Sequence, residues 1–469
     1  MQKPTEQGIG NVTIPVGAAA ILRKLNLAGF DAYVVGGCVR DSLLGRIPHD
    51  WDICTNATPV EVTEALPGIQ ILPTGIKYGT VTAMVDGVPY EVTTFRCDGS
   101  YRDGRRPDSV AFIGRLEDDL ARRDFTVNAM AYHPDRGLID PYGGRKDLAD
   151  RIIRCVGDAN QRFREDGLRI LRAMRFASVL DFEIEALTSS AMREEVNRLD
   201  MVSPERLGME LRKLICGRNA ATVLLEHKVI LFHMVPEMEP TDGCEQNNKY
   251  HYATVFRHTL DALENANAPI SRFPREWADE YTKMALLLHD IGKPMCKTTD
   301  ANGHDHFYEH PAKSAVIAEG VLMRLRYSRE YIDAVVELIE NHDITLTPTK
   351  PCARRLLNKH SVEQLHRLFK LRECDNCAHS EAAYPLFENT VKTEMVLNEV
   401  LEEQARFSLK DLAVKGGDLK EIGIAPGPGM GKILNALLDA VIDEQILNEK
   451  EPLLQLAAAL KDNKEEMCL

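Results

Sequence analysis

The sequence predicts an α+β protein, in which a small mixed N-terminal unit is followed by a long all-helical remainder. Its 469 residues correspond to three or four folding units at roughly 100–200 residues each. Short apolar runs and glycine turns fill residues 31–113, whereas apolar residues recur at helical spacing from about residue 158 onward. The composition, 44% hydrophobic and 27% charged, excludes a collagen, a low-complexity disordered chain and a disulfide miniprotein.

The N-terminal unit combines one early helix with several short strands. The expected elements are a helix within 11–30 and strands at 31–35, 79–85, 88–95 and 110–113. Asp86-Gly87 joins two of these strands, and this dipeptide is typical of a tight hairpin turn. The first strand runs directly into Gly36-Gly37, and a polar, arginine-rich segment precedes the last.

Helical periodicity dominates the rest of the chain. It is clearest in residues 164–180, 203–216, 254–267, 281–289, 311–326 and 330–341. The segment 416–431 interrupts it, because its prolines and glycines cannot continue a helix.

The charge distribution bears on the class of partner. The net charge of −14, read as an average, argues against a nucleic-acid partner, because phosphate binding relies on Lys and Arg. However, residues 375–469 hold 9 basic and 18 acidic residues, whereas residues 96–175 hold 17 basic and 14 acidic. The acidity is therefore concentrated near the C-terminus, and nucleic-acid binding of modest salt sensitivity remains compatible with the sequence.

Composition also indicates the compartment. No run approaches the roughly 20 apolar residues of a membrane span, and the first residues lack the pattern of a signal peptide. The eleven cysteines are odd in number and scattered, which is typical of reduced thiols. Cys374 and Cys377 form the only close pair, and without a second pair they are expected to be ordinary helical cysteines. We expect a cytoplasmic protein that does not contact a membrane.

A glycine turn suited to phosphate follows the first strand. In Gly36-Gly-Cys-Val-Arg40, two glycines without side chains let backbone N–H groups approach a phosphate closely. Arg40 follows as a planar donor that can hold the phosphate through two nitrogens. The alternative is a simple Gly-Gly turn.

Paired carboxylates follow within the next residues. Asp50 and Asp52, if they lie in a strand, point to one face because side chains alternate. Two adjacent carboxylates repel unless a cation lies between them, and Mg²⁺ prefers such oxygen ligands. Glu91, on a neighbouring predicted strand, is placed to complete a two-metal site. The alternative is two solvated aspartates.

A second group of charged residues is Arg122-Arg123-Asp124, followed by Asn128. The two arginines can contact a triphosphate, while Asp124 or Asn128 reaches a sugar hydroxyl. A surface ion pair at a helix end explains the same residues equally well, and such a pair contributes little to stability.

A third group lies on the helix predicted over 164–180. Asp166 and Arg169 are i,i+3 neighbours, so that acceptors and donors lie side by side on one helix face. This combination suits a base edge with an amino group and a ring acceptor, which cytosine and adenine share. Arg172 and Arg175 continue the row. The alternative is a solvated, salt-bridged stripe.

Together these motifs resemble a known family. The ordered patterns GGxVRDxLLG…DxD, RRDFTVNA, Asp140-Pro-Tyr-Gly-Gly144 and EDxxRxLRAxRFA resemble bacterial tRNA nucleotidyltransferases, the CCA-adding enzymes. They are of the class that shares its head with bacterial poly(A) polymerases. Ser203-Pro-Glu-Arg206 with Glu210 resembles the last neck motif of that family, and residues 416–431 resemble part of its tail.

The resemblance implies a DNA-polymerase-β-like nucleotidyltransferase head followed by an all-helical neck, an HD-like body and a tail. The expected boundaries are 1–155 for the head, 156–216 for the neck with its base-selecting helix, 217–374 for the body and 375–469 for the tRNA-contacting tail. The implied activity is template-independent addition of C, C and A to tRNA 3′ ends from CTP and ATP, with release of pyrophosphate.

The resemblance also implies residue roles. Asp50 and Asp52 would bind catalytic Mg²⁺, with Glu91 as the third carboxylate. The nucleotide-binding residues would be Gly37, Arg40, Arg123, Asp166, Arg169, Arg172 and Arg175. The arginine-rich segment 96–107 is similar to the flexible loop that the family uses in switching from C to A, which favours complete CCA addition.

A second metal site is expected in the body. Seven of the fourteen histidines fall between residues 251 and 342. His258, His289-Asp290 and Asp343 resemble the H…HD…D pattern of HD-domain phosphohydrolases. Imidazole with carboxylate suits Mn²⁺, Ni²⁺ or Fe²⁺, and His310 and His342 are candidate extra ligands. The alternative is a helical tRNA-binding body without turnover.

Other functions remain open at this point. A poly(A) polymerase would share the head motifs, although no long Lys/Arg-rich C-terminal extension is present in this sequence. An HD phosphohydrolase with an RNA-binding head, or a noncatalytic RNA-binding protein, would have no use for the carboxylates Asp50, Asp52 and Glu91.

Overall fold

The computed structural model describes residues 12–98, 110–267, 278–402, 409–443 and 445–466. The chain divides into two compact units. The first comprises Met1–Glu239 and Val321–Tyr327, and the second comprises Pro240–Gly320 and Ser328–Leu469. Helix α18 (Val362–Cys377) passes through residue 374, where the sequence placed the end of the body. Among the described residues, none of the helices has the length and apolarity needed to cross a membrane.

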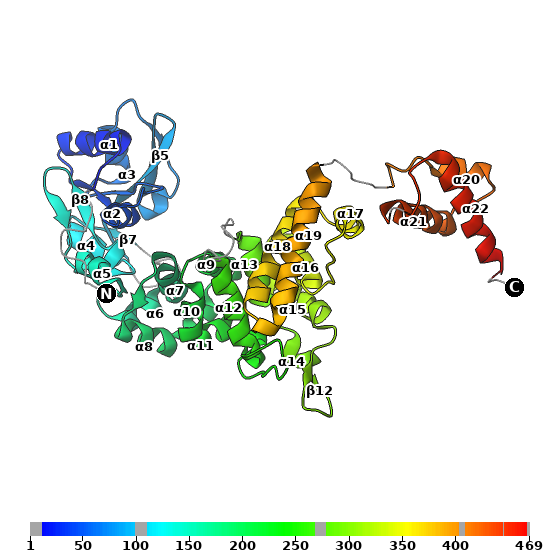
Figure 1. Ribbon diagram of the computed structural model, residues 1–469. Helices are drawn as coiled ribbons and strands as arrows, with labels where there is room; N and C mark the ends of the chain where they lie inside the picture. Colours follow the sequence, from blue (N-terminus) through cyan, green and yellow to red (C-terminus); the bar gives the residue numbers. More distant parts are fainter. Residues whose placement is uncertain (1–11, 99–109, 268–277, 403–408, 444, 467–469) are drawn as a thin grey trace. The chain divides into compact units, whose positions relative to one another are not determined.

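A seven-stranded sheet forms the centre of the N-terminal unit, in the order β3-β4-β5-β2-β1-β8-β9 (Figure 1). Its strands are β1 (Ala32–Val35), β2 (Ile53–Thr55), β3 (Gln70–Leu72), β4 (Thr80–Val85), β5 (Val88–Thr94), β8 (Ala131–His133) and β9 (Gly137–Ile139). Strands β2 and β5 run parallel, and the other neighbouring pairs are antiparallel. The sheet confirms the α+β class.

Local sequence explains the central strands. All four residues of β1 are buried, as an apolar run without alternation predicts for an inner strand. The β4–β5 hairpin turns at Asp86 and Gly87, which both have positive φ (51° and 79°), as a type I′ turn requires. The hairpin predicted from this dipeptide is therefore confirmed.

Short helices and a second hairpin surround the sheet. They are α1 (Val16–Leu27), α2 (Gly37–Leu43), α3 (Pro59–Ala65), α4 (Leu116–Ala121), α5 (Gly144–Asp150) and the paired strands β6 (Arg96–Asp98) and β7 (Val110–Phe112). Leu116 and Leu120 of α4 pack with Tyr33 and Phe95 in a core beneath the sheet. This packing fixes α4, and with it the arginines that follow, against the strands.

Helices complete the first unit. They are α6 (Ala159–Glu165), α7 (Leu168–Leu180), α8 (Ala186–Glu194), α9 (Pro204–Ile215), α10 (Ala220–Glu226) and α11 (Lys228–Met234). The single helix predicted over 164–180 is wrong, because Asp166 is extended (φ −143°, ψ 105°) between α6 and α7. A Cβ on Gly167 would lie 2.4 Å from the Arg198 carbonyl oxygen, so only glycine allows this close approach.

The second unit is helical, as the periodicity predicts. Its helices are α12 (Val255–Asn267), α13 (Glu280–Leu288), α14 (Lys293–Cys296), α15 (His310–Arg324), α16 (Arg329–Asn341), α17 (Lys350–Lys359), α18 and α19 (Tyr384–Glu402), then α20 (Gly416–Glu421), α21 (Pro428–Ile442) and α22 (Lys450–Glu466). The predicted break in 416–431 separates α20 from α21, with Gly427 at φ 148°. The last three helices have their own apolar core.

Candidate functional site

The three predicted carboxylates of the head lie near one another where the chain enters the central strand β2 beside β5. Asp50 and Asp52 lie just before β2 rather than within a strand, so the argument from strand alternation is wrong for them. The carbonyl of Asp52 nevertheless accepts a hydrogen bond from Val35 N at 3.0 Å, which fixes this residue to β1. Because Ile53 pairs with Val92 in the parallel β2–β5 ladder, Asp52 is level with Glu91.

Electrostatics shows that these carboxylates are crowded. Burial, then the charges of Asp50 and Glu91, raise the pKa of Asp52 to about 6, against the opposing influence of Arg123. Such crowding favours a cation at the site, and oxygen-only ligands suit Mg²⁺. Among the described residues, sets of three ligand atoms within 4.8 Å of one another occur in the helical body, not here.

The glycine turn and two arginines lie beside the carboxylates. Gly36 has φ +81°, and a Cβ there would lie 2.9 Å from Arg123 Nη1. Helix α2 begins directly after it, at Gly37, and a Cβ on Gly37 would lie 3.7 Å from Arg40 Nη2. The fold therefore brings Gly37, Arg40 and Arg123 together, and guanidinium donors of this kind suit phosphate. Arg40 is held by Asp41, to which its Nε and Nη2 donate at 2.8 and 2.9 Å.

A hydrogen-bonded chain connects this turn to α7. Arg40 Nη1 donates to Asn128 Oδ1 at 2.6 Å, and Asn128 Nδ2 donates to Asp124 Oδ1 at 3.1 Å. Arg172 Nε donates to the other oxygen of Asp124 at 2.9 Å. Burial would raise the pKa of Asp124, but Arg172 and Asn128 outweigh it and hold the pKa well below its usual range. Asp124 thus holds its neighbours, and does not fit the alternative of a surface ion pair.

An aromatic ring that the sequence reasoning missed organises the arginines. The guanidinium carbons of Arg40, Arg172 and Arg175 lie 5.1, 5.3 and 4.0 Å from the centroid of Phe176. Phe176 is buried, and Arg175 Nε also donates to Glu210 at 2.6 Å. Cation–π contacts at such distances stabilise positive charge over the ring face. The aromatic residue after Arg175 in the motif was the available signal.

The predicted base-reading pair is held from both sides. Asp166 follows α6 and Arg169 lies in the first turn of α7, so the two residues flank a helix break rather than lie along one helix. Arg169 donates to Glu165 Oε2 at 2.7 Å and to the Arg122 carbonyl at 2.8 Å. Asp166 Oδ2 accepts from Arg206 Nη2 at 2.9 Å. Their orientation is therefore fixed before any ligand binds, unlike that of a solvated stripe.

The arginine-rich loop lies mostly outside the described residues, at 99–109. The structure shows only its two arms, β6 and β7, paired antiparallel from Arg96↔Phe112 to Asp98↔Val110.

A cluster of histidines and aspartates is buried in the helical body. Its ligand atoms form overlapping sets within 4.8 Å, which include His258, His289 and Asp375, and also His289, Asp290 and His342. Asp343 is exposed beside His342 and belongs to none of these sets. The carboxylate that faces His258 and His289 is instead Asp375 on α18, at 2.8 and 3.4 Å.

Sequence reasoning missed Asp375 because it treated 374–377 only as a cysteine pair. Cys374 is buried, Cys377 is exposed, and all nine cysteines whose side chains are described are free. The available signal was Asp375 near the end of α18 with His379 four residues later, just after the helix.

The two oxygens of Asp290 face different histidines. Its Oδ2 lies 3.2 Å from His289 Nε2 and 3.7 Å from His258 Nε2. Its Oδ1 lies 3.4 Å from His310 Nε2 and 3.8 Å from His342 Nε2. His289 Nε2 and Asp290 Oδ1 are buried without a hydrogen-bond partner, whereas Asp290 Oδ2 is ion-paired with Lys293. Because unpaired buried polar atoms are costly, this arrangement fits ligands directed at a metal ion.

Charge in the cluster supports the same conclusion. Burial opposes a charged imidazole, but Asp290 and Asp375 outweigh it and raise the pKa of His289 to about 10. The ammonium of Lys293 lies 2.7 Å from Asp290 Oδ2. The two carboxylates therefore create a field that attracts positive charge, and a metal ion bound there would displace the proton of His289.

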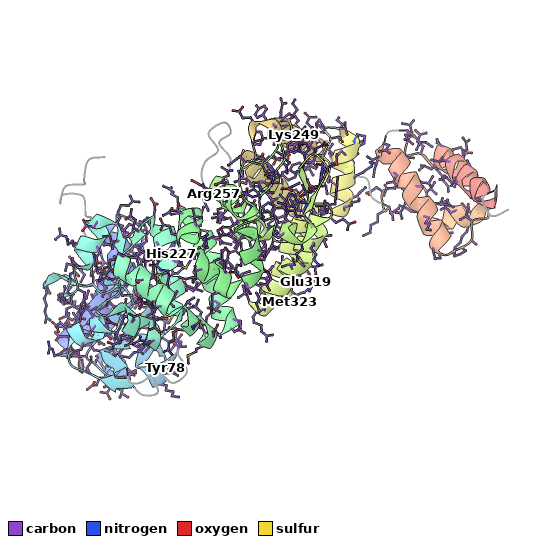
Figure 2. The ribbon with its side chains drawn as sticks, turned by 90° about the horizontal axis from the view of Figure 1, so that it is seen from below. Tyr78, His227, Lys249, Arg257, Glu319 and Met323 are labelled. Carbon is purple, nitrogen blue, oxygen red and sulfur yellow. The ribbon has the colours of Figure 1, made fainter. Side chains whose placement is uncertain are left out.

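A cavity of about 780 Å³ opens onto this cluster. Its walls include Asp290, His310, His342 and Asp375, together with Lys249, which is labelled in Figure 2. A cavity of this size accommodates a small organic molecule.

Comparisons with known proteins match both the sheet-containing head and the helical body. The chain matches the family models of the Poly A polymerase head domain over residues 32–154, the RNA and SrmB-binding site of polymerase A over 181–241, and tRNA nucleotidyltransferase domain 2 over 313–457. It is 50% identical to the CCA-adding enzyme of Pediococcus pentosaceus, covering 95% of this chain and 98% of that protein. The chain belongs to the CCA-adding enzymes.

Further relatives of the CCA-adding enzymes support this membership. The enzyme of Streptococcus thermophilus is 32% identical over 95% of this chain and 96% of its own length. The crystal structure of the Bacillus stearothermophilus CCA-adding enzyme in complex with CTP is 29% identical, with a TM-score of 0.72 over 97% of this chain and 100% of that chain. The resemblance seen in the motifs is confirmed, and the chain is a nucleotidyltransferase of this family.

Proposed function

We propose that the chain adds C, C and A in turn to the 3′ end of tRNA, using CTP and ATP and releasing pyrophosphate. The observation that carries the proposal is the level placement of Asp52 and Glu91 beside the turn at Gly36, against which Arg123 lies. A relative of this family has been crystallised with CTP, one of the two proposed nucleotides. The two alternatives, a poly(A) polymerase and a phosphohydrolase with a noncatalytic head, have no comparable support.

Asp50, Asp52 and Glu91 are the residues that would hold Mg²⁺, and their crowded charge fits that role. Bound Mg²⁺ supplies activation of the attacking 3′-hydroxyl and neutralisation of the leaving pyrophosphate. The backbone N–H groups of the turn at Gly36, with Arg40 and Arg123, bind and orient the triphosphate. The chain thereby places the α-phosphate in front of the three carboxylates.

Base choice belongs to Asp166 and Arg169. The carboxylate of Asp166 accepts from an amino group, and the guanidinium of Arg169 donates to a ring nitrogen or carbonyl. Their partners Glu165 and Arg206 keep these groups in place, so protein atoms replace a nucleic-acid template. Arg172 and Arg175 complete the wall of the same pocket.

The test is incorporation of labelled CTP and ATP into a tRNA that lacks its 3′-terminal CCA, in the presence of Mg²⁺. The expected result is three additions, two of C and one of A, followed by a stop. Unlimited addition of A would identify a poly(A) polymerase instead. Omission of Mg²⁺ with a chelator present should abolish incorporation, and unchanged activity there would contradict the metal assignment.

A second function is favoured by the unpaired ligand atoms of the body. We infer that His258, His289, Asp290 and Asp375 hold a transition metal such as Mn²⁺, Ni²⁺ or Fe²⁺, with His310 and His342 on the other side of Asp290. Asp375 takes the place first assigned to Asp343. A bound metal supplies an activated water, and the adjoining cavity supplies room for a phosphate ester.

This second function is tested separately from the first. Asp52→Ala removes the head activity, and in that background the protein is assayed with p-nitrophenyl phosphate and each metal in turn. We expect hydrolysis that His289→Ala abolishes. Equal hydrolysis by the His289→Ala variant would show that the activity does not come from this site. We also propose a cytoplasmic location, since the substrates are tRNA and nucleotides and the described cysteines are free.

A further inference from the structure

A buried carboxylate behind the nucleotide pocket has no part in the function proposed so far. Asp119 lies on α4 and is completely buried. Arg122 donates to its Oδ1 through both Nε and Nη2, at 3.0 and 2.8 Å. Arg123 Nη2 lies 3.5 Å from the other oxygen, Oδ2. One carboxylate thus contacts both members of the arginine pair.

The two arginines extend from Asp119 toward different parts of the pocket. Arg123 reaches the turn at Gly36, and its charge acts on the carboxylate of Asp52. The carbonyl of Arg122 accepts from Arg169, the predicted base-reading arginine. The position of Asp119 therefore bears on the phosphate end and on the base end of the same pocket.

Asp119 also contacts the root of the arginine-rich hairpin. The backbone N–H of Arg96, the first residue of β6, donates to Asp119 Oδ1 at 3.3 Å. The side chain of Arg96 in turn donates to the carbonyl of Tyr78, which is labelled in Figure 2. Asp119 Oδ1 therefore connects β6 to Arg122, while Oδ2 of the same carboxylate lies against Arg123.

Physical chemistry explains why an acid is placed here. Two adjacent guanidinium groups repel each other, and more so in a poorly solvated place. A buried carboxylate is costly, and a buried ion pair contributes little net stability, so stability alone does not explain Asp119. What Asp119 contributes is orientation, because a guanidinium held through two nitrogens keeps a fixed plane and points its remaining donors in one direction.

We propose that Asp119 is a positioning residue that holds Arg122 and Arg123 in the orientation that binds the nucleotide triphosphate. The inference rests on the proposed nucleotidyl transfer in the head. Without Asp119 the pair keeps its charge and loses its fixed direction, so nucleotide binding weakens while the chemical step, once the nucleotide is bound, proceeds at nearly the same rate.

The experiment measures KM for CTP and kcat on a tRNA lacking CCA for wild type and Asp119→Asn. We expect KM to rise about tenfold with kcat changed less than twofold, the pattern of lost uniform binding. Arg122→Lys is the second variant, because it keeps the charge but cannot make the two-nitrogen contact. Its side chain is 19% exposed, against 1% for Asp119, so it tests the same contact with less risk to folding.

A double variant and a control complete the design. If Asp119 acts through Arg122, Asp119→Asn raises KM less than threefold in the Arg122→Lys background. Asp147→Asn is the matched control, since Asp147 is 4% exposed and bonded to Arg154 and Thr126, away from the arginine pair. It should lower Tm and leave KM unchanged.

Two results would overturn the proposal: an unchanged KM in Asp119→Asn and Arg122→Lys, or a fall in kcat at constant KM. Multiplicative effects in the double variant would support it and assign the effect to Arg123, the other arginine that Asp119 contacts. If wild type incorporates CTP and both single variants have the KM of wild type, only the role of Asp119 is rejected. Absence of incorporation by wild type would instead reject the function of the head.

Discussion

The head and the body each gather acidic or imidazole ligands around one centre, but they use different chemistry. In the head, three carboxylates lie near one another beside the central strands β2 and β5, and Asp50 and Glu91 are exposed. In the body, His258, His289 and Asp290 are about 1% exposed, with His258 on α12 and the other two in the turn after α13. The first arrangement presents oxygen ligands, which suit Mg²⁺, and the second adds imidazole, which suits a transition metal.

The contrast shows how each region tolerates its charge. The head places arginines beside its carboxylates, and in the proposed function these same arginines bind phosphate. The body pairs Asp290 Oδ2 with Lys293 and leaves His289 Nε2 and Asp290 Oδ1 without a hydrogen-bond partner, a cost that a bound metal would remove. The two proposed metal sites therefore differ in ligand type and in burial.

The largest expected effect concerns the head carboxylates. Asp52→Ala should lower CTP incorporation by roughly a thousandfold or more, because it removes a ligand that no neighbour replaces. Binding of tRNA, measured by gel shift, should change less than twofold. Asp135→Ala, whose side chain is 91% exposed in the same unit, is the control and should keep full activity. Retained incorporation in Asp52→Ala would refute the metal assignment.

The next effect separates the two candidate aspartates of the body. Asp375→Asn should lower the affinity for the transition metal by roughly tenfold or more, because loss of a residue that only supports a ligand already costs that much. Asp343→Asn should retain its bound metal. Metal content per chain is measured by mass spectrometry after purification. CTP incorporation should stay unchanged in both variants, which shows that the two centres are independent. Equal metal loss in both would contradict the assignment of Asp375.

A smaller effect concerns base choice. Arg169→Ala should reduce the preference for CTP over UTP by about tenfold, because a charged hydrogen bond to the base is lost. The measurement is kcat/KM for each nucleotide with a tRNA lacking CCA. Arg164→Ala on α6 is the matched control, since that arginine is 58% exposed and pairs with Glu195. Unchanged discrimination in Arg169→Ala would remove this residue from base reading.

The smallest effect is a pH-dependent change of stability. The folded state raises the pKa of Asp52 to about 6, so the charged carboxylate destabilises the metal-free protein above that pH. Asp52→Asn should therefore raise Tm by about 2 °C at pH 7.5 with a chelator present. The gain should disappear as pH falls through 6 toward 4, because wild type then takes up the proton. A gain that persists at pH 4 would show that the charge of Asp52 is not its cause.

Much of the head could be predicted from the sequence because its ligands are close along the chain or on paired strands. Gly36, Gly37 and Asp52 belong to one short segment, and the Asp86-Gly87 hairpin placed Glu91 in the sheet. The error there was local, since Asp50 and Asp52 precede β2 instead of lying in it. The helix break at Asp166 was missed because periodicity continues through it, whereas contact with Arg198 decides it.

The body shows the limit of such reasoning. His289 and Asp290 are adjacent and were found, but their remaining partner had to come from a distant helix. Asp343 and Asp375 are both acidic residues downstream of the motif, and nothing local distinguishes them. The packing of α12 and α13 against α18 brings Asp375 to 2.8 Å from His258 and leaves Asp343 exposed.

The sequence by itself determined the order of the motifs, the α+β class and the residue types available for chemistry, because these depend on local pattern and composition. The tertiary structure alone decided which residues from distant segments share one charge, as Asp375 does for His258 and His289. It also buried Asp119, so that this carboxylate contacts both of its sequence neighbours Arg122 and Arg123 away from solvent. The physical reason is that burial and pairing act over a few ångströms in space, and helix and strand packing sets those distances.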